Sequence, residues 1–446
     1  MNEHGMNGAA GEAHPREEGR PLLFRNARII DPAAGREIRG DLLVREGRIA
    51  AIGQAIAPPE GAATIDCAGA CLAPGIIDVG VKVGEPGERH KESYRTASAA
   101  AAAGGVTTIV TRPDTAQPID TPETLEFVRR RAAEVAQIRI HPMAALTRRR
   151  EGREMSEIGL LMDAGAVAFT DGDHVVEDTK VLARCLTYAA MMGAKVIGHV
   201  QDPGLSRGAA ATAGKFAALK GLPAVPAMAE RMGLMRDLAL VELTGADWHA
   251  DQVTTRSALA VLARAKEAGL AVTAGCSIHH LTLNEFDIGD YRTFFKLKPP
   301  LRAEEDRVAA VEAVASGLID IIASMHTPQD EESKRLPFEE AASGAVGLET
   351  LLPAALRLVH GGQLDLPRLF RALSLRPAEI FGLEGGRMQR GAPADLVLFD
   401  PDRPFILDRF ALHSKSKNTP FDGARMEGRV LGTWVGGRQI FPAGDG

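Results

Sequence analysis

Three side chains that can bind a metal ion or carry a proton lie within or just behind short apolar runs. Asp171 follows the run 166–169, His199 lies in the run 195–200, and His326 follows the run 319–323. Imidazoles and carboxylates are common zinc ligands and common general acids and bases. A histidine that is only a hydrogen-bonded part of the core is the plainer interpretation of His199, because a buried imidazole needs polar partners. The elements that position these residues decide between the two interpretations.

The middle of the chain, residues 73–385, alternates short apolar runs with amphipathic helical segments. An alternation sustained over so long a stretch favours a closed (β/α)₈ barrel of the TIM type over an open sheet. In such barrels the reactive groups lie at the carboxyl ends of the strands. The expected strands include 106–110, 166–169, 195–200, 271–274 and 319–323, and the expected helices include 122–135 and 256–268.

The two ends of the chain have a different pattern. Residues 1–20 are polar and lack apolar periodicity, so they are predicted to form a flexible tail. Short β-like runs in 21–72 and 386–446 predict a small β-domain built from both termini. Within the second segment, GRVLGTWVGGRQI (residues 428–440) predicts a hairpin that turns at its paired glycines.

Composition excludes several classes of protein. The formal net charge of −6 argues against a nucleic-acid or membrane-surface partner, and no apolar stretch is long enough to span a membrane. Four cysteines in 446 residues do not make a disulfide framework. The N-terminus lacks the apolar segment of a secretion signal, so we expect a cytoplasmic protein.

The first expected barrel strand carries a recognisable motif. APGIIDVGVKVGEPG (residues 73–87) resembles the PG-[LI]-ID-x-H-x-H-x-R-E-P-G signature of the dihydroorotases, which belong to the amidohydrolase superfamily. The resemblance implies an amidohydrolase-type barrel that interconverts N-carbamoyl-L-aspartate and dihydroorotate in pyrimidine biosynthesis. Family members use a divalent metal such as zinc and an Asp that moves the proton. The resemblance to the dihydroorotases continues through GGVTTIVTRPDTAQP, AVAFTDG, GHVQD, HHLTLNE, FKLKPPLRAEEDR, DIIASMHTP, GLET and KNTPF.

Most metal-ligand positions implied by the resemblance hold other residues. Residues two apart on a strand share a face, so an HxH pair reaches one ion. Here those two positions are Gly80 and Lys82, which offer no free lone pair at neutral pH. Gln252 stands at a third ligand position, and only Asp171 and His199 match the family ligands. Catalytic zinc usually needs three protein ligands.

The proton shuttle and the substrate contacts also differ from the family. Met325 stands where the catalytic Asp belongs, and a thioether cannot carry a proton. Asp114 and Lys298 each replace an Asn, and Gly84 replaces the Arg that would bind a carboxylate. The resemblance places the substrate pocket at Lys82, Arg112, Asp114, Lys298 and His326.

These departures favour a protein that is inactive as a dihydroorotase and needs no cofactor. Non-catalytic homologues of this kind pair with aspartate carbamoyltransferase, so the resemblance implies that partner and a homo- or hetero-oligomer. The alternatives are an active zinc-dependent cyclic amidohydrolase with a rearranged site, a metal-independent hydrolase, and a pocket that senses a small anion through Lys82, Arg112 and Lys298. We further expect Lys82 to pair with Asp171 inside the former metal pocket.

Overall fold

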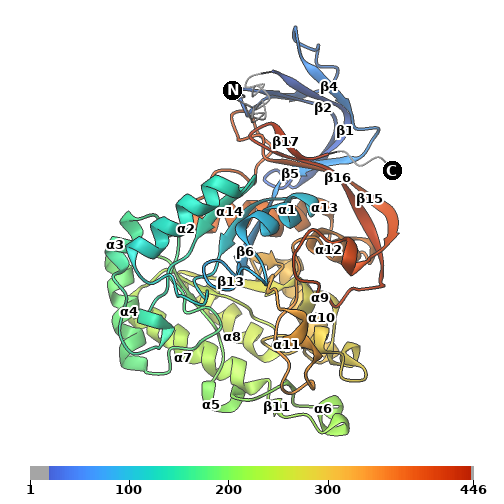
Figure 1. Cartoon of the computed structure of the whole chain (residues 1–446). Helices are drawn as coiled ribbons and strands as arrows, with labels where there is room; N and C mark the ends of the chain where they lie inside the picture. Colours follow the sequence, from blue (N-terminus) through green and yellow to red (C-terminus); the bar gives the residue numbers. More distant parts are fainter. Residues whose placement is uncertain (1–19, 443–446) are drawn as a thin grey trace, which may run out of the picture.

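The computed structural model describes residues 20–442, and the predicted tail lies outside them except for Arg20. The middle of the chain forms the expected (β/α)₈ barrel (Figure 1). One arc of parallel strands runs β6-β7-β8, and a second runs β14-β13-β12-β9. Phe169 joins the arcs by bridges to Ala144 and Val196. The barrel strands are β6 (Ile76–Val81), β7 (Val106–Thr111), β8 (Arg139–Pro142), β9 (Val196–Gly198), β12 (Trp248–Ala250), β13 (Val272–Ser277) and β14 (Ile321–Ala323).

Helices cover the outside of the barrel. The expected helix 122–135 is α2 (Pro122–Val135), and it begins where sequence predicts, because Thr121 caps it and Pro122 occupies its first turn. The other long helices are α1 (Tyr94–Ala103), α4 (Thr179–Met192), α7 (Met228–Thr244), α8 (Arg256–Glu267), α10 (Glu304–Ser316) and α12 (Leu351–His360). The shorter ones are α3 (Ile158–Asp163), α5 (Pro203–Ser206), α6 (Lys215–Lys220), α9 (Ile278–Thr282), α11 (Glu331–Arg335), α13 (Leu366–Phe370) and α14 (Arg376–Phe381). None of the helices in residues 20–442 is both long enough and apolar enough to cross a bilayer.

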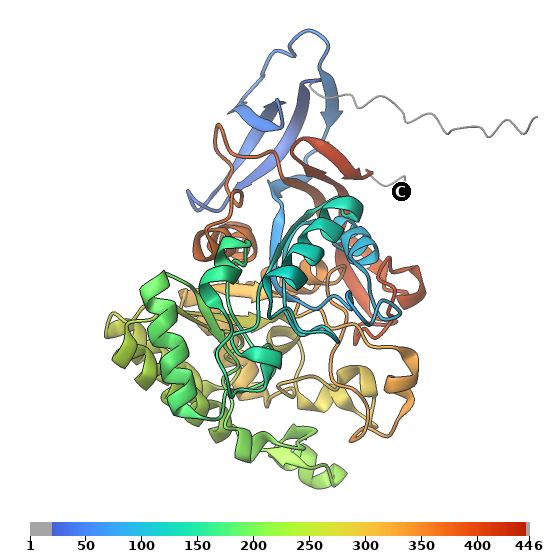
Figure 2. The ribbon, with the colours of Figure 1, turned by 60° about the vertical axis from the view of Figure 1, so that its left-hand side comes forward.

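A second sheet combines strands from the two ends of the chain and lies at one end of the barrel (Figures 1 and 2). Its order is β17-β16-β15-β5-β1-β2-β3, and β4 pairs with β1. The predicted hairpin is β16–β17, and its turn is Gly436-Gly437, both with positive φ. The strands are β1 (Leu22–Asp31), β2 (Arg36–Arg45), β3 (Arg48–Gly53), β4 (Ala63–Asp66), β5 (Cys71–Pro74), β15 (Leu396–Ile406), β16 (Arg425–Val435) and β17 (Arg438–Phe441).

Two expected barrel strands differ from the structure. The first expected strand, at the start of the motif 73–87, is divided between β5, which belongs to the terminal sheet, and β6, which opens the barrel. Gly75 separates them, and a Cβ there would lie 2.2 Å from the Thr107 side chain, so the chain passes too close for a larger residue. The run 166–169 forms only the two bridges of Phe169, which is a shorter pairing than its apolar pattern predicts.

The interior of the barrel is filled by side chains, so ligands can reach only its ends. One apolar cluster occupies this interior, and the large side chains of Met325 and Phe381 belong to it. Its other buried members are Val79, Val110, Met143, Ala168, Ile197, Ile321 and Ala323. The candidate site therefore lies above this plug, at the carboxyl ends of the strands.

Candidate functional site at the mouth of the barrel

Gly80, at the first ligand position that the resemblance implies, is packed against Met325. It lies in β6 with a φ of +84°, a conformation that favours glycine. A Cβ at this position would lie 2.9 Å from the Met325 sulfur and 3.8 Å from Oδ1 of Asp251. Met325 is buried and itself has a φ of +49°. The thioether therefore occupies the space that an imidazole at position 80 would need.

Lys82, at the second ligand position that the resemblance implies, forms an ion pair with Asp114. Its Nζ lies 3.3 Å from Oδ2 of Asp114, and the same carboxylate accepts from Arg112 Nε at 3.0 Å and from a terminal guanidinium nitrogen at 2.6 Å. Burial by itself raises the pKa of Asp114, but Arg112 and Lys82 outweigh it and hold the pKa below its usual range. The expected pairing of Lys82 with Asp171 is wrong.

Asp171 is instead bound by the loop that follows β8. The backbone N–H of Thr147 donates to one carboxylate oxygen at 3.0 Å, and the Thr147 hydroxyl donates to the other. The Asp171 carbonyl accepts from Arg150 Nε at 2.9 Å. Burial raises the pKa of Asp171, and the bonds from Thr147 oppose that shift. Both carboxylate oxygens of Asp171 thus have partners within the protein.

A second carboxylate, Asp173, is shared by two cations. Arg150 lies 3.0 Å from its Oδ1 and Lys298 lies 3.1 Å from its Oδ2. Burial works against ionisation, but Arg112, Lys298 and the other charges nearby lower the pKa of Asp173 strongly. Lys298 therefore projects into the mouth as part of an ion pair.

His199 directly follows β9 and faces another carboxylate, Asp251. Its Nδ1 lies 4.0 Å from Oδ2 of Asp251, which is beyond hydrogen-bond distance, and its buried Nε2 has no hydrogen-bond partner among the described residues. Burial lowers the pKa of His199 to about 3, so the ring is neutral at pH 7. Burial also raises the pKa of Asp251 to about 6. The side chain of Gln252 opposes this upward shift by hydrogen bonding, and its amide donates to the Lys298 carbonyl at 3.4 Å.

Two other histidines have structural partners. His249 lies in the barrel wall, where Nδ1 is 2.8 Å from the Thr273 hydroxyl. His326 is fully buried beside Glu92, with Nε2 3.5 Å from that carboxylate, while Nδ1 accepts from the Gly347 backbone at 3.1 Å. The proximity of Glu92 to the Ser414 hydroxyl extends this contact to the C-terminal segment. His326 therefore lies behind the mouth.

A cavity of about 910 Å³ opens beside these residues. His199 and Lys298 line it, together with Asp173, Arg150 and Gln201. Lys82, Arg112 and Asp114 are not part of its lining, so the structure separates the sequence-predicted pocket residues into an ion cluster and a cavity wall. Gln201 Oε1 is buried without a hydrogen-bond partner in the described part of the chain, as is His199 Nε2.

The residues at the mouth do not fit the divalent metal that the family resemblance implies. The two β6 positions offer no ligand atom, Asp171 accepts hydrogen bonds from Thr147, and the Gln252 amide donates to the Lys298 carbonyl. Across residues 20–442, no group of three or more His, Cys, Asp or Glu side chains is arranged to hold a metal ion. We therefore derive no chemical step through a metal.

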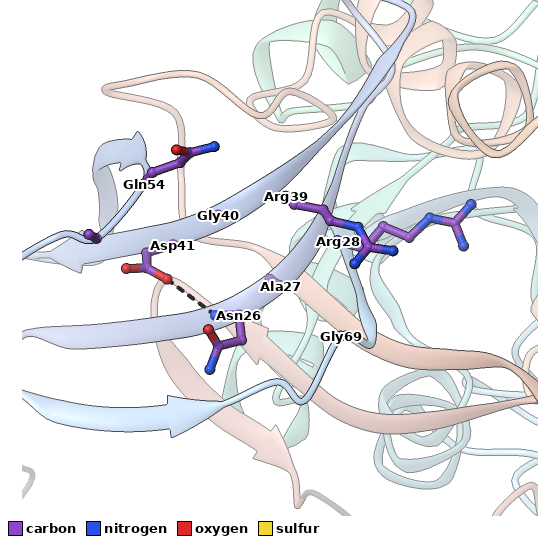
Figure 3. Close-up of a pocket in the computed structure, with 9 residues that line it drawn as sticks. Asn26, Ala27, Arg28, Arg39, Gly40, Asp41, Gln54 and Gly69 are labelled. Atoms are coloured by element: carbon purple, nitrogen blue, oxygen red, sulfur yellow. Dashed lines mark hydrogen bonds between the residues drawn. The ribbon is translucent and has the colours of Figure 1, made fainter.

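A smaller pocket of about 400 Å³ lies in the terminal sheet (Figure 3). Its carboxylate, Asp41, accepts from the backbone N–H groups of Asn26 at 3.2 Å and Ile56 at 3.0 Å. Arg28, which also lines it, pairs with Glu37. Asp41 thus stabilises the irregular stretch of β1 after Phe24, and this pocket is a weaker candidate than the barrel mouth.

Sequence reasoning missed three residues of the mouth: Arg150, Asp173 and Asp251. Asp173 stands two residues after Asp171, and Asp251 directly follows β12. The rule that reactive groups follow barrel strands could have found both carboxylates. The family motifs instead indicate the neighbouring residues Asp171 and Gln252.

Comparison with known proteins agrees with this architecture. The family described as dihydro-orotase-like matches residues 69–258. A Wolbachia dihydroorotase is 39% identical over 427 residues, covering 95% of this chain and 96% of the relative, and a Syntrophus aciditrophicus dihydroorotase is 37% identical over 94% and 99%. The solved L-hydantoinase of Arthrobacter aurescens superposes with a TM-score of 0.86 at 26% identity, over 95% of this chain and 96% of that one. With relatives of this identity along nearly its whole length, the chain belongs to the dihydroorotase family of the amidohydrolase superfamily.

Proposed function

We propose that this protein is a cytoplasmic, non-catalytic member of the dihydroorotase family in pyrimidine biosynthesis, and that it acts as a structural partner of aspartate carbamoyltransferase. The proposal rests on one observation: Lys82, at the position of the metal-binding motif, pairs with Asp114, which also binds Arg112. An ammonium held there repels a divalent cation and cannot ligate it.

Met325 supports the same proposal. Its buried thioether packs against Gly80 at the position of the family's proton shuttle. Ring opening needs a group that takes and returns a proton, and neither side chain can do so. The loss of both metal ligands and shuttle removes two parts of a unit that fails when one part is lost.

The partnership with aspartate carbamoyltransferase rests on the family resemblance and on the separability of fold and site. A barrel that keeps its packing also keeps its outer surfaces after its pocket has changed. Assembly with a partner enzyme is a function that such surfaces can still perform.

An active dihydroorotase is the second candidate, and the names of the relatives favour it. Curated dihydroorotases are 37–39% identical over 94–95% of this chain. Asp251 and His199 would then be the groups nearest the reacting atoms, because they face each other at the mouth.

One set of measurements separates the two. The full chain is incubated with zinc, dialysed, and analysed for bound metal and for turnover of dihydroorotate and N-carbamoyl-L-aspartate. We expect no stoichiometric zinc and no turnover, together with co-purification of the aspartate carbamoyltransferase encoded in the same genome. Bound zinc with turnover supports the active enzyme and overturns the proposal, and an enzyme pair that never co-purifies overturns the partnership.

A further inference from the structure

Helix α7 carries a stripe of exposed apolar side chains along its outer face. Met228, Met232, Met235 and Leu243 are 46%, 44%, 49% and 74% exposed, and Ala239 between them is exposed too. Their spacings of four, three, four and four residues follow the helical repeat, so they form one line. Such a line on an outer helix of a barrel, facing away from the core, is typical of an interface.

The charges of α7 indicate what covers the stripe. Arg236 pairs with Asp237, and Glu230 is buried against Arg302. This leaves Arg231 and Glu242 as the α7 charges that form no salt bridge within residues 20–442. The Nε atom of Arg231 is buried and has no hydrogen-bond partner among the same residues. An unmatched cation and an unmatched anion therefore flank the stripe.

Arg231 and Glu242 lie on the same flank of the helix. They are eleven residues apart, which is close to three helical turns, so their side chains project in nearly the same direction. A twofold axis perpendicular to two antiparallel helices keeps each flank on its own side and reverses the direction along the helix. It would place Arg231 of one copy beside Glu242 of the other, twice.

We propose that the α7 stripe is the contact surface of a homodimer in which two copies pack their α7 helices antiparallel, with the twofold axis near residues 236 and 237. The midpoint of the two charges lies one residue from the midpoint of the stripe. One placement therefore aligns the apolar side chains and both ion pairs. A parallel pairing would instead put Arg231 of one copy and Glu242 of the other on opposite flanks of the interface and about three helical turns apart, so that neither ion pair could form.

Methionine suits such a surface, because its flexible side chain adapts to the irregular profile of an identical partner. A stable dimer buries about 800 Å² on each partner, so neighbouring elements must contribute. Helix α4 packs beside α7 (Figures 1 and 2), and its side chain Met191 is 77% exposed.

Sedimentation equilibrium of the full chain tests the proposal. We expect wild type to dimerise, and Met232→Glu with Met235→Glu to raise the dissociation constant at least roughly thirtyfold, as the loss of interface hot spots does. Ile406→Lys is the matched control, since Ile406 is 73% exposed in β15, away from α7. A monomeric wild type, or a dimer that survives both substitutions, overturns the proposal.

Charge swaps test the antiparallel geometry. Arg231→Glu and Glu242→Arg should each weaken the homodimer, and an equimolar mixture of the two variants should form heterodimers, because every cross-copy pair then joins opposite charges. A mixture that associates no better than either variant alone contradicts the twofold arrangement.

Cross-linking locates the axis. All four native cysteines are buried, so Met235→Cys adds an exposed thiol close to its twin. A short bismaleimide should join the two chains through it. Leu243→Cys should not cross-link to itself, because its twin would lie about 20 Å away along the helices. Efficient cross-linking at 243 but not at 235 overturns the proposed register.

Discussion

Replacing Asp114 by Asn should lower the free energy of unfolding of the barrel by far more than the loss of an exposed surface charge would. Asp114 is buried, and its guanidinium partner Arg112 is only 8% exposed. Asn keeps the shape but removes the charge that compensates both Arg112 and Lys82. Breaking a buried pair while its partner stays charged costs about 3–5 kcal/mol in the free energy of unfolding.

The chain offers its own reporters for this measurement. Trp248 lies in β12 of the barrel and Trp434 in β16 of the terminal sheet, and these are the two tryptophans of the protein. In a Trp434→Phe background, fluorescence during urea unfolding follows the barrel alone. The shift in midpoint multiplied by the slope gives the change in free energy.

Two further variants test whether the buried ion pair causes the loss of stability. Asp290→Asn makes the same chemical change at an exposed ion pair with Lys220 and should leave the midpoint unchanged. Lys82→Met should cost less than Asp114→Asn, because Arg112 still satisfies the carboxylate through both of its bonds. A loss below about 1 kcal/mol for Asp114→Asn would refute the reasoning, since an exposed pair contributes that much.

The pH dependence has a definite sign. The pKa of Asp114 is held below its usual range by Arg112 and Lys82, which outweigh burial. Its contribution to stability is therefore complete above its unfolded pKa near 3.9 and is lost as the pH falls through the lower folded value. The difference between wild type and Asp114→Asn should shrink only below about pH 4.

Three further outcomes are expected. A variant that restores the family's ligands and proton shuttle, with Gly80→His, Lys82→His, Gln252→His and Met325→Asp, should retain stoichiometric zinc after a dialysis that strips wild type. Equal metal content in both proteins would contradict the assignment of the ligand positions. Burial lowers the pKa of His249 to about 3, so between roughly pH 3 and 6.5 the unfolded chain binds a proton that the folded chain does not, and His249→Asn should flatten the acid-side loss of stability by about 1.4 kcal/mol per pH unit. Ser414→Ala leaves buried Glu92 short of one donor, costs about 1–3 kcal/mol, and should speed proteolysis of the C-terminal segment; an unchanged cleavage rate would argue against that tether.

Local signals predicted local structure well. The bounds of α2 follow from the cap and proline at its start, and the β16–β17 turn follows from two adjacent glycines. The run 166–169 is apolar enough for a strand, but only Phe169 pairs, because strand length depends on neighbours that the run itself does not reveal.

The partner of Lys82 follows from the order of the strands in the barrel and not from the family motif. Asp171 was expected because it is a family ligand, but it follows the fourth strand position of the barrel. β6 pairs directly with β7, with Val81 opposite Thr111, so the residues just beyond each strand end are neighbours. That register favours Asp114 over Asp171, and strand adjacency was already implied by the predicted barrel.

Four of the departures from the pattern implied by the resemblance lie in two contacting pairs, and this bears on whether the pocket decayed or was rebuilt. Gly80, which lacks a side chain, faces Met325, whose thioether fills the vacated space. Lys82, a new cation, lies on Asp114, a new anion, and Lys298, another new cation, pairs with Asp173. Independent losses would leave buried charges without partners and cavities without filling, at a cost of several kcal/mol each. In the Gly80–Met325 and Lys82–Asp114 pairs, each residue removes the penalty that the other would create, so reverting any single member of either pair should destabilise the mouth.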